Sequence, residues 1–163
     1  MAHELKQIKN TAFSFLLAAD RCFEERPLPN GQFQMPLVPA IVCTAFGIEL
    51  CLKGIITIEK GKATGHDLLK LFIKLSPHSK AALAAALAHE ESALCQKLGS
   101  ISSAFVEWRY IYESPAASIN SDFLIQFSKA AAQLFELLAN PPLNADARPN
   151  GGAPVSSSSR RSG

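Results

Sequence analysis

The chain lacks most of the short patterns that identify a chemical function. Its 163 residues include four cysteines and nine glycines, but no paired C-x-x-C spacing and no glycine-rich phosphate-binding loop. The four histidines form no ligand spacing with one another or with the cysteines. The sequence HEESA at 89–93 also lacks the second histidine of a zinc-protease helix. We therefore expect no metal site and no bound cofactor.

Charge is scarce as well. Charged residues make up 18% of the chain, below the usual quarter, and the formal net charge is +2. Residues 141–163 contain three arginines and one aspartate, so residues 1–140 hold 13 basic and 13 acidic side chains and are neutral. A neutral body lacks the broad positive surface that non-specific nucleic-acid binding requires. A small local basic patch is still compatible with this balance.

The cysteines and the N-terminal segment point to one cellular compartment. Each cysteine lies inside an apolar helical pattern, far from the others: Cys22, Cys43, Cys51 and Cys95. The first residues, MAHELKQIKN, are charged and polar, unlike a secretory signal. We expect buried, reduced thiols in a cytoplasmic protein.

One long apolar segment has the length of a membrane span. Leu37 to Ile58 is 22 residues long and almost wholly apolar. Pro39 lies near its start, and Glu49 and Lys53 lie inside it, each costing about 2.5–3.5 kcal/mol at the centre of a membrane helix. A helix that is apolar all round also suits the centre of a soluble bundle. We expect the second arrangement and no membrane.

Helical periodicity dominates the first half of the chain, and no run of strict alternation indicates a strand. Apolar residues at three- and four-residue steps predict a first amphipathic helix over 5–23. The sequence RPLPNGQFQMP at 26–36 predicts an irregular loop. An apolar helix follows over 38–59. A short helix, LLKLFIKL, then begins after His66 and Asp67, with Asp67 capping its free amides.

The second half predicts three more helices. Ser76 and Pro77 form a clear helix start, and the alanine-rich helix that follows is expected to reach Leu98 and stop at Gly99. The next helix spans about a dozen residues and ends at Ser114–Pro115. One of its faces carries a mainly aromatic stripe: Ile101, Phe105, Trp108 and Tyr112. A last helix covers 122–139.

These patterns define the domain organisation. The fold class is all-α, with five to six helices in a single bundle over residues 1–140. Residues 141–163 are rich in proline, glycine and serine and have almost no large apolar side chain. Such a composition does not repay the entropy of folding, so we expect a disordered C-terminal tail.

Three short segments carry a recognisable combination of residues. AFGIELCLKGI at 45–55 places Glu49 and Lys53 one turn apart on an apolar helix. GHDLLKLF at 65–72 is a glycine–histidine–aspartate start to a short helix. FVEWRYIYE at 105–113 is an aromatic-rich helix that carries Arg109. In this order, the segments resemble the HEPN superfamily (higher eukaryotes and prokaryotes nucleotide-binding domain), specifically small stand-alone bacterial members, and the resemblance covers residues 1 to 139.

The resemblance implies an up-and-down helical bundle that often forms a homodimer. Many members are RNA-cleaving toxins or defence effectors, some within toxin–antitoxin systems with a cognate partner protein; others only bind nucleotides. The cleaving members carry an arginine followed four to six residues later by a histidine, and these stabilise phosphate charge and move protons. Arg109 matches the arginine here, but Ser114, Pro115 and Ala116 stand where the histidine would be.

The resemblance therefore implies RNA or nucleotide binding with little or no catalysis. One alternative is an active, metal-independent endoribonuclease that uses Arg109 with a non-standard partner such as His66. A further alternative is a purely structural or interaction module. The candidate catalytic residues are Arg109 and His66. Those expected to bind a ligand or shape the site are Glu49, Lys53, Tyr110, Tyr112 and Glu113.

Each candidate also has an ordinary structural explanation. Glu113 lies four residues after Arg109, so the two are spaced to pair on a helix. If its side chain turns inward, Arg109 would instead meet Glu49. Because Glu49 lies on an apolar helix, its charge needs a partner, which is either Arg109 or Lys53. His66 suits a hydrogen-bonded turn. Tyr110 points to another face than the aromatic stripe and is the better candidate for stacking on a base.

Overall fold

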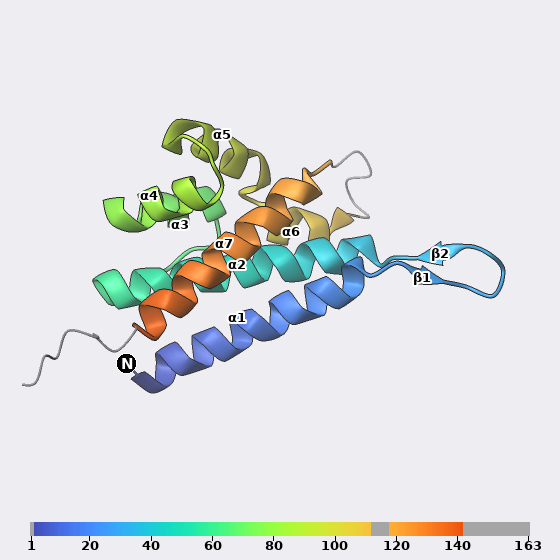
Figure 1. Ribbon diagram of the computed structural model, residues 1–163, viewed down its shortest axis with the longest axis horizontal. Helices are drawn as coiled ribbons and strands as arrows, with labels where there is room; N and C mark the ends of the chain where they lie inside the picture. The colour runs from blue at the N-terminus through green and yellow to red at the C-terminus, as the bar shows by residue number, and fades with distance from the viewer. Residues whose placement is uncertain (1, 112–117, 142–163) are drawn as a thin grey trace, which may run out of the picture.

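Helix α2 (Leu37–Lys60) is the central element of the structure, a computed structural model that describes residues 2–111 and 118–141. Helix α1 (Ala2–Phe23) lies against it in the antiparallel direction, and α7 (Ser121–Ala139) packs against α2 and runs parallel to it (Figure 1). The remaining helices are α3 (Leu68–Ile73), α4 (Pro77–Ala86), α5 (Glu91–Ile101) and α6 (Ala104–Arg109). The expected all-α bundle is confirmed.

Two glycines let the neighbouring helices approach α2 closely. A Cβ atom on Gly54 would lie 2.2 Å from Cζ of Phe135 on α7, and one on Gly47 would lie 2.5 Å from Cδ2 of Leu16 on α1. Phe135 is completely buried, so its ring occupies space that any larger residue at position 54 would need. The apolar character of α2 therefore follows from its contact with helices on several sides.

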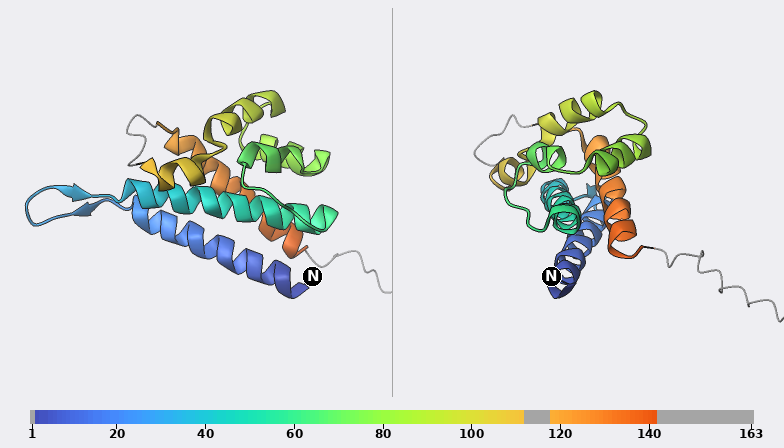
Figure 2. Two further views of the ribbon diagram at one scale, coloured as in Figure 1. Left: turned by 180° about the vertical axis from the view of Figure 1, so that it is seen from behind. Right: turned by 90° about the vertical axis from the view of Figure 1, so that its left-hand side faces the viewer.

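Helices α3, α4 and α5 form a second group that lies on the opposite side of α2 from α1 (Figure 2). One continuous apolar core joins them to α2 and α7. Its largest fully buried side chains are Phe72, Phe127, Phe135, Ile41, Ile48, Leu52, Ile55, Ile56, Leu68, Leu71, Leu83 and Leu94. Helix α6 also packs on α2, and its Trp108 is buried.

Helix α2 is long and apolar enough to cross a membrane by length and composition alone, with a mean hydropathy of 1.9 over an 18-residue window. Other parts of the chain bury 67% of that window. It is thus the central helix of the bundle, as its sequence predicts.

The segment expected to be an irregular loop contains a small hairpin. Strand β1 (Arg26–Pro27) pairs antiparallel with β2 (Phe33–Gln34), and all four residues are exposed. Gly31 adopts φ 78° at the turn, a conformation that glycine reaches without strain. The hairpin projects beyond the end of the bundle, between α1 and α2 (Figure 1). Two-residue strands are too short to show an alternating pattern, which is why no alternation in this segment indicated a strand.

Both predicted helix caps are present. The Asp67 carboxylate accepts a hydrogen bond from the Lys70 amide at 2.9 Å, and the Ser76 hydroxyl accepts one from the Ser79 amide at 3.1 Å. These side chains satisfy amides that the first turn of a helix leaves free. Short polar side chains before an apolar run are therefore reliable helix starts in this chain.

The prediction of one alanine-rich helix over 77–98 is wrong, because two helices cover this segment. Helix α4 ends at Ala86, and Ala88 takes φ 52°, a conformation unusual for alanine. The Ala88 and His89 amides donate to the carbonyls of Ala85 and Ala84, which closes the helix before α5 begins. Gly99 does not stop that second helix, which continues to Ile101.

The aromatic helix expected to span a dozen residues is also shorter. Helix α6 has six residues, and a turn at 102–103 separates it from Ile101. The expected end at Ser114–Pro115 and the predicted tail lie outside the described residues, apart from Pro141.

The four cysteines are free thiols that differ in burial. Cys51 is buried, and burial raises the pKa of its thiol to about 12, so the reactive thiolate is absent near neutral pH. Burial and the nearby Cys22 raise the pKa of Cys43. All four are free and, unlike the expectation of full burial, Cys22, Cys43 and Cys95 are half-buried.

Candidate functional site

The candidate site is built around Glu49, a carboxylate in the middle of α2 with no exposed surface. Its neighbours on the helix, Ile48, Cys51 and Leu52, are also fully buried. An ionised carboxylate in such a position is costly unless charged or hydrogen-bonding groups surround it. The contacts of Glu49 are therefore the first evidence for what this site does.

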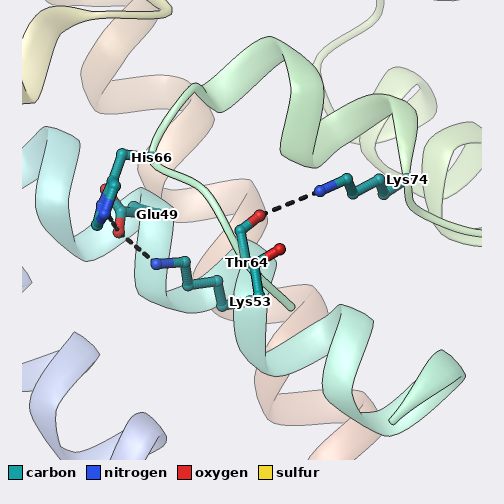
Figure 3. A network of polar contacts seen from close by, with 5 residues as sticks. All are labelled: Glu49, Lys53, Thr64, His66 and Lys74. Carbon is teal, nitrogen blue, oxygen red and sulfur yellow. Dashed lines mark hydrogen bonds and ion pairs between the residues drawn. The ribbon is translucent and has the colours of Figure 1, made fainter. Parts of the chain in front are cut away.

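Two cationic or potentially cationic side chains meet one oxygen of Glu49. Lys53 Nζ lies 2.7 Å from Oε1, and His66 Nδ1 lies 2.9 Å from the same atom. Lys53 comes from the next turn of α2, whereas His66 comes from the loop before α3, so that its ring stands beside the carboxylate (Figure 3). The structure thus brings together three of the residues that the sequence singled out.

The second oxygen of Glu49 is different. Oε2 is buried and has no hydrogen-bond partner within residues 2–111 and 118–141. Most buried polar atoms in proteins do have a partner, and an unsatisfied charged one costs more than a neutral one. Glu49 is therefore an under-satisfied carboxylate, in a place where additional positive charge would be stabilised.

The contact with Glu49 assigns the proton on the His66 ring. Oε1 of Glu49 accepts a hydrogen bond from the Lys53 ammonium, so it acts as an acceptor. A hydrogen bond from Nδ1 to that oxygen requires the proton to be on Nδ1. In the neutral ring, the lone pair is then on Nε2. The side chain of His66 is 66% exposed, whereas that of Lys53 is 19% exposed.

The loop that carries His66 is shaped by glycine and tied down by backbone contacts. Gly61 and Gly65 take φ 94° and 102°, which only glycine adopts easily. Lys74 Nζ donates to the Thr64 carbonyl at 3.1 Å, joining the loop to the end of α3 (Figure 3). Lys60 in turn bonds the Lys74 carbonyl. His66 is therefore held by both its side chain and its backbone surroundings.

A surface hollow of about 330 Å³ adjoins this cluster. It lies between the first turns of α1, the second half of α2 and the loop after α2, and Lys53 forms part of its wall. The other lining residues are Glu4, Ile8, Leu50, Thr57, Gly61, Lys62 and Ala63. Lys53 thus contributes both to the buried ion pair and to the wall of an open pocket.

Arg109 does not join this cluster. Its guanidinium lies over the rings of Phe105 and Tyr110, at 5.1 and 4.8 Å from the ring centres. Both Arg109 and Tyr110 are exposed, and no ion pair of Arg109 occurs among the described residues. Of the two partners predicted for Glu49, the prediction of Lys53 is confirmed and that of Arg109 is wrong.

A chain of aromatic contacts connects Arg109 to α2. Phe105 stacks on Phe46 with ring centres 4.8 Å apart, and Phe46 meets Phe15 of α1 edge-on at 4.6 Å. Phe46 precedes Glu49 by three residues, so it lies about one helical turn away. Two other candidates, Tyr112 and Glu113, lie outside the described residues, as do the positions 114–116.

Sequence reasoning missed one polar network, at the end of α2. Glu59 accepts hydrogen bonds from the Ser76 amide and hydroxyl at 2.8 and 2.7 Å and from the Ser79 hydroxyl. The helix start at Ser76 was visible in the sequence, but its carboxylate partner lies 17 residues away. No group of three or more metal-ligating side chains occurs in the described part of the chain.

Comparison of the chain with protein-family models, with curated proteins and with solved structures finds no match in any of the three.

Proposed function

We propose that the chain is a HEPN-like helical domain that binds RNA or a nucleotide with little or no catalysis. One observation carries the proposal: an exposed arginine, Arg109, at the end of α6, stacked against the exposed ring of the next residue, Tyr110. An arginine offers hydrogen bonds to phosphate, and a neighbouring aromatic ring offers a face for a base. Single-stranded nucleic acids and nucleotides present both groups together.

The charge around the Glu49 cluster supports the same proposal. Between Glu49 and Lys74 the chain has five lysines against three carboxylates, in a body that is neutral as a whole. Glu49 is buried, while Lys60, Lys62, Lys70 and Lys74 are exposed. This segment is the small basic patch that the neutral total leaves room for, and local positive charge favours a phosphate-containing ligand.

Binding of a labelled single-stranded RNA, followed by fluorescence anisotropy, tests the proposal. We expect the full chain to bind, with an affinity that falls as salt increases, and Arg109→Ala to weaken binding by about tenfold or more. Lys97→Ala is a matched control, because Lys97 also lies over an aromatic ring, that of Phe123, at 5.4 Å. Equal binding by the wild type and Arg109→Ala would reject the proposal.

The second candidate function is an active, metal-independent endoribonuclease. The His66–Glu49 contact favours it, because a histidine held by a carboxylate is suited to moving protons. Incubation of RNA with the purified chain in the presence of a chelator tests this directly. Cleavage that disappears in both His66→Gln and Arg109→Ala would establish the enzyme and reject the non-catalytic proposal.

We propose a cytoplasmic homodimer, outside the membrane, acting in a bacterial defence or toxin–antitoxin system with a cognate partner protein. Sedimentation of the purified chain measures the oligomeric state, and a stable monomer at micromolar concentration would contradict the dimer. A purely structural module would bind no RNA and would lose stability, rather than binding, in Arg109→Ala.

A further inference from the structure

His66 has an environment that the other described histidines lack. Its Nδ1 meets a buried carboxylate, while the ring itself is mostly exposed. No ion pair of His3, His78 or His89 occurs within the described ranges. A histidine that only shaped the turn would not need contact with a fully buried glutamate, one oxygen of which has no hydrogen bond from residues 2–111 and 118–141. The arrangement instead prepares one ring nitrogen for chemistry at the surface.

We propose that His66 is a phosphoryl acceptor that is phosphorylated on Nε2. Because Nδ1 holds the proton and faces Glu49, the Nε2 lone pair is the nucleophile. The exposure of the side chain allows a donor to approach it from solvent. This proposal concerns an activity distinct from RNA binding and does not depend on it.

The phosphoryl donor that we assign is a phosphoramidate, whose nitrogen is the leaving group. The Nε2 lone pair attacks phosphorus, an Nε2–P bond forms, and the bond between phosphorus and the donor nitrogen breaks. The electron pair of that bond leaves with the donor nitrogen, which already carries the proton it needs and departs as ammonia. The proton on Nδ1 of His66 stays in place, so the ring becomes an imidazolium.

Glu49 stabilises the product of this step. The new positive charge on the exposed ring lies against the buried Oε1 of Glu49, 2.9 Å from Nδ1. Oε2 has no competing donor within residues 2–111 and 118–141. Lys53 holds the carboxylate in position through its 2.7 Å contact. Glu49 is thus a positioning residue, and His66 is the residue that reacts.

The positive charge of lysines near the loop is complementary to the negative charge of a phosphoryl group. Lys62 and Lys70 lie four residues to either side of His66 in the sequence, and both are exposed. A phosphoryl group carries close to two negative charges at neutral pH and three acceptor oxygens. Long lysine side chains supply compact, mobile positive charge of the kind that phosphate groups bind.

The test uses the full chain and phosphoramidate as the probe. Intact-mass spectrometry at neutral or higher pH counts the phosphoryl groups, and phosphorus-coupled NMR identifies the ring nitrogen. We expect the first phosphoryl group to appear on Nε2 of His66, before any on His78, and none at position 66 in His66→Gln. His78→Gln is the matched control, because His78 is also exposed and should leave the modification unchanged.

The role of Glu49 has its own measurement. We expect Glu49→Gln to slow modification of His66 by about tenfold or more, as for other partners that orient a reactive histidine. The rate at His78 in the same molecule is an internal reference that a merely structural change would not move selectively. Circular dichroism checks that the variant is folded.

Modification rates in the wild-type protein test the proposal even if Glu49→Gln does not fold. Modification of His66 faster than both His78 and free N-acetylhistidine supports it. Modification of His66 no faster than those references, or no modification at all, overturns it. Attachment to Nδ1 instead of Nε2 would also overturn it, because the Glu49 contact would then have to be broken.

Discussion

Two carboxylates on α2 are held in opposite ways. Glu59, near the end of the helix, receives hydrogen bonds on both oxygens from Ser76 and Ser79. Glu49, in the middle of the helix, has two contacts on one oxygen and none from the described residues on the other. Glu59 contacts neutral donors of the N-cap and first turn of α4, whereas Glu49 contacts a lysine and a histidine.

The pKa of Glu59 reflects its surroundings. Burial alone would raise this pKa, but the hydrogen bonds from Ser79 and Ser76 and the charge of Lys60 lower it below the ordinary value of 4.5. The folded state therefore favours the ionised form of Glu59, and the network stabilises the junction between α2 and α4.

The comparison teaches how to separate a structural carboxylate from a functional one. A glutamate whose oxygens are both satisfied by the fold contributes to stability and has nothing left to offer a ligand. A fully buried glutamate with an exposed histidine beside it, and with one oxygen that accepts no hydrogen bond from a described residue, stabilises the fold less. The cost of burying its charge is not fully offset by its contacts.

Glu59→Ala should lower the free energy of unfolding by about 2–4 kcal/mol, because it removes charge-assisted hydrogen bonds and leaves the buried Ser79 hydroxyl without its acceptor. Urea denaturation measures the change. Glu136→Ala is the control, since Glu136 pairs with Lys9 at the surface and should matter much less. A loss below about 1 kcal/mol at Glu59 would remove the structural half of the comparison.

Acid should reduce the contribution of Glu59. A lowered folded-state pKa stabilises the protein above the unfolded-state pKa, and that stabilisation is lost as pH falls through the lowered value. The stability difference between the wild type and Glu59→Gln should therefore be constant near neutrality and shrink below about pH 5. Urea denaturation at a series of pH values measures it. A difference that grows on acidification would contradict the direction of the shift.

Arg109→Ala should cost only about 0.5–1 kcal/mol, the usual size of an exposed cation–π contact. A pair with the buried Glu49 would make the same substitution cost several times more. Thermal unfolding distinguishes the two sizes, with Arg109→Lys as a variant that retains the charge. A large loss would restore Arg109 as a structural partner of the core.

Replacing both Glu49 and Lys53 by methionine should leave stability unchanged or raise it slightly, because a buried ion pair rarely outperforms apolar side chains of similar size. The same double variant should lose the selective reactivity of His66. Chemical denaturation and the phosphoramidate reaction, measured on one preparation, test both statements. A marked loss of stability would make Glu49 as structural as Glu59.

Much of the fold could be predicted from the sequence. Apolar periodicity located α1, α2 and α7, and the capping side chains of Asp67 and Ser76 located the starts of α3 and α4. These signals are local, since each depends on residues within one or two turns. The break at Ala88 was missed because alanine favours helix and no glycine marks the left-handed position.

The site was predictable as a set of residues but not as an arrangement. Glu49 and Lys53 are four residues apart on one helix, so their contact follows from helix geometry. His66 reaches Glu49 across 17 residues, through a loop whose path depends on Gly61 and Gly65. Arg109 is at the end of a six-residue helix, and its direction depends on where Phe105 packs against Phe46.

Spacing and capping act over a few residues, so the helical class, the starts of α3 and α4 and the burial of α2 could be predicted from the sequence. Contacts between distant segments could not: that Glu49 holds His66 instead of Arg109, and that Glu59 receives its hydrogen bonds from Ser76 and Ser79, became visible in the folded chain. A buried carboxylate must be neutralised by whichever donors the packing of distant segments brings to it, and that packing is a property of the whole chain.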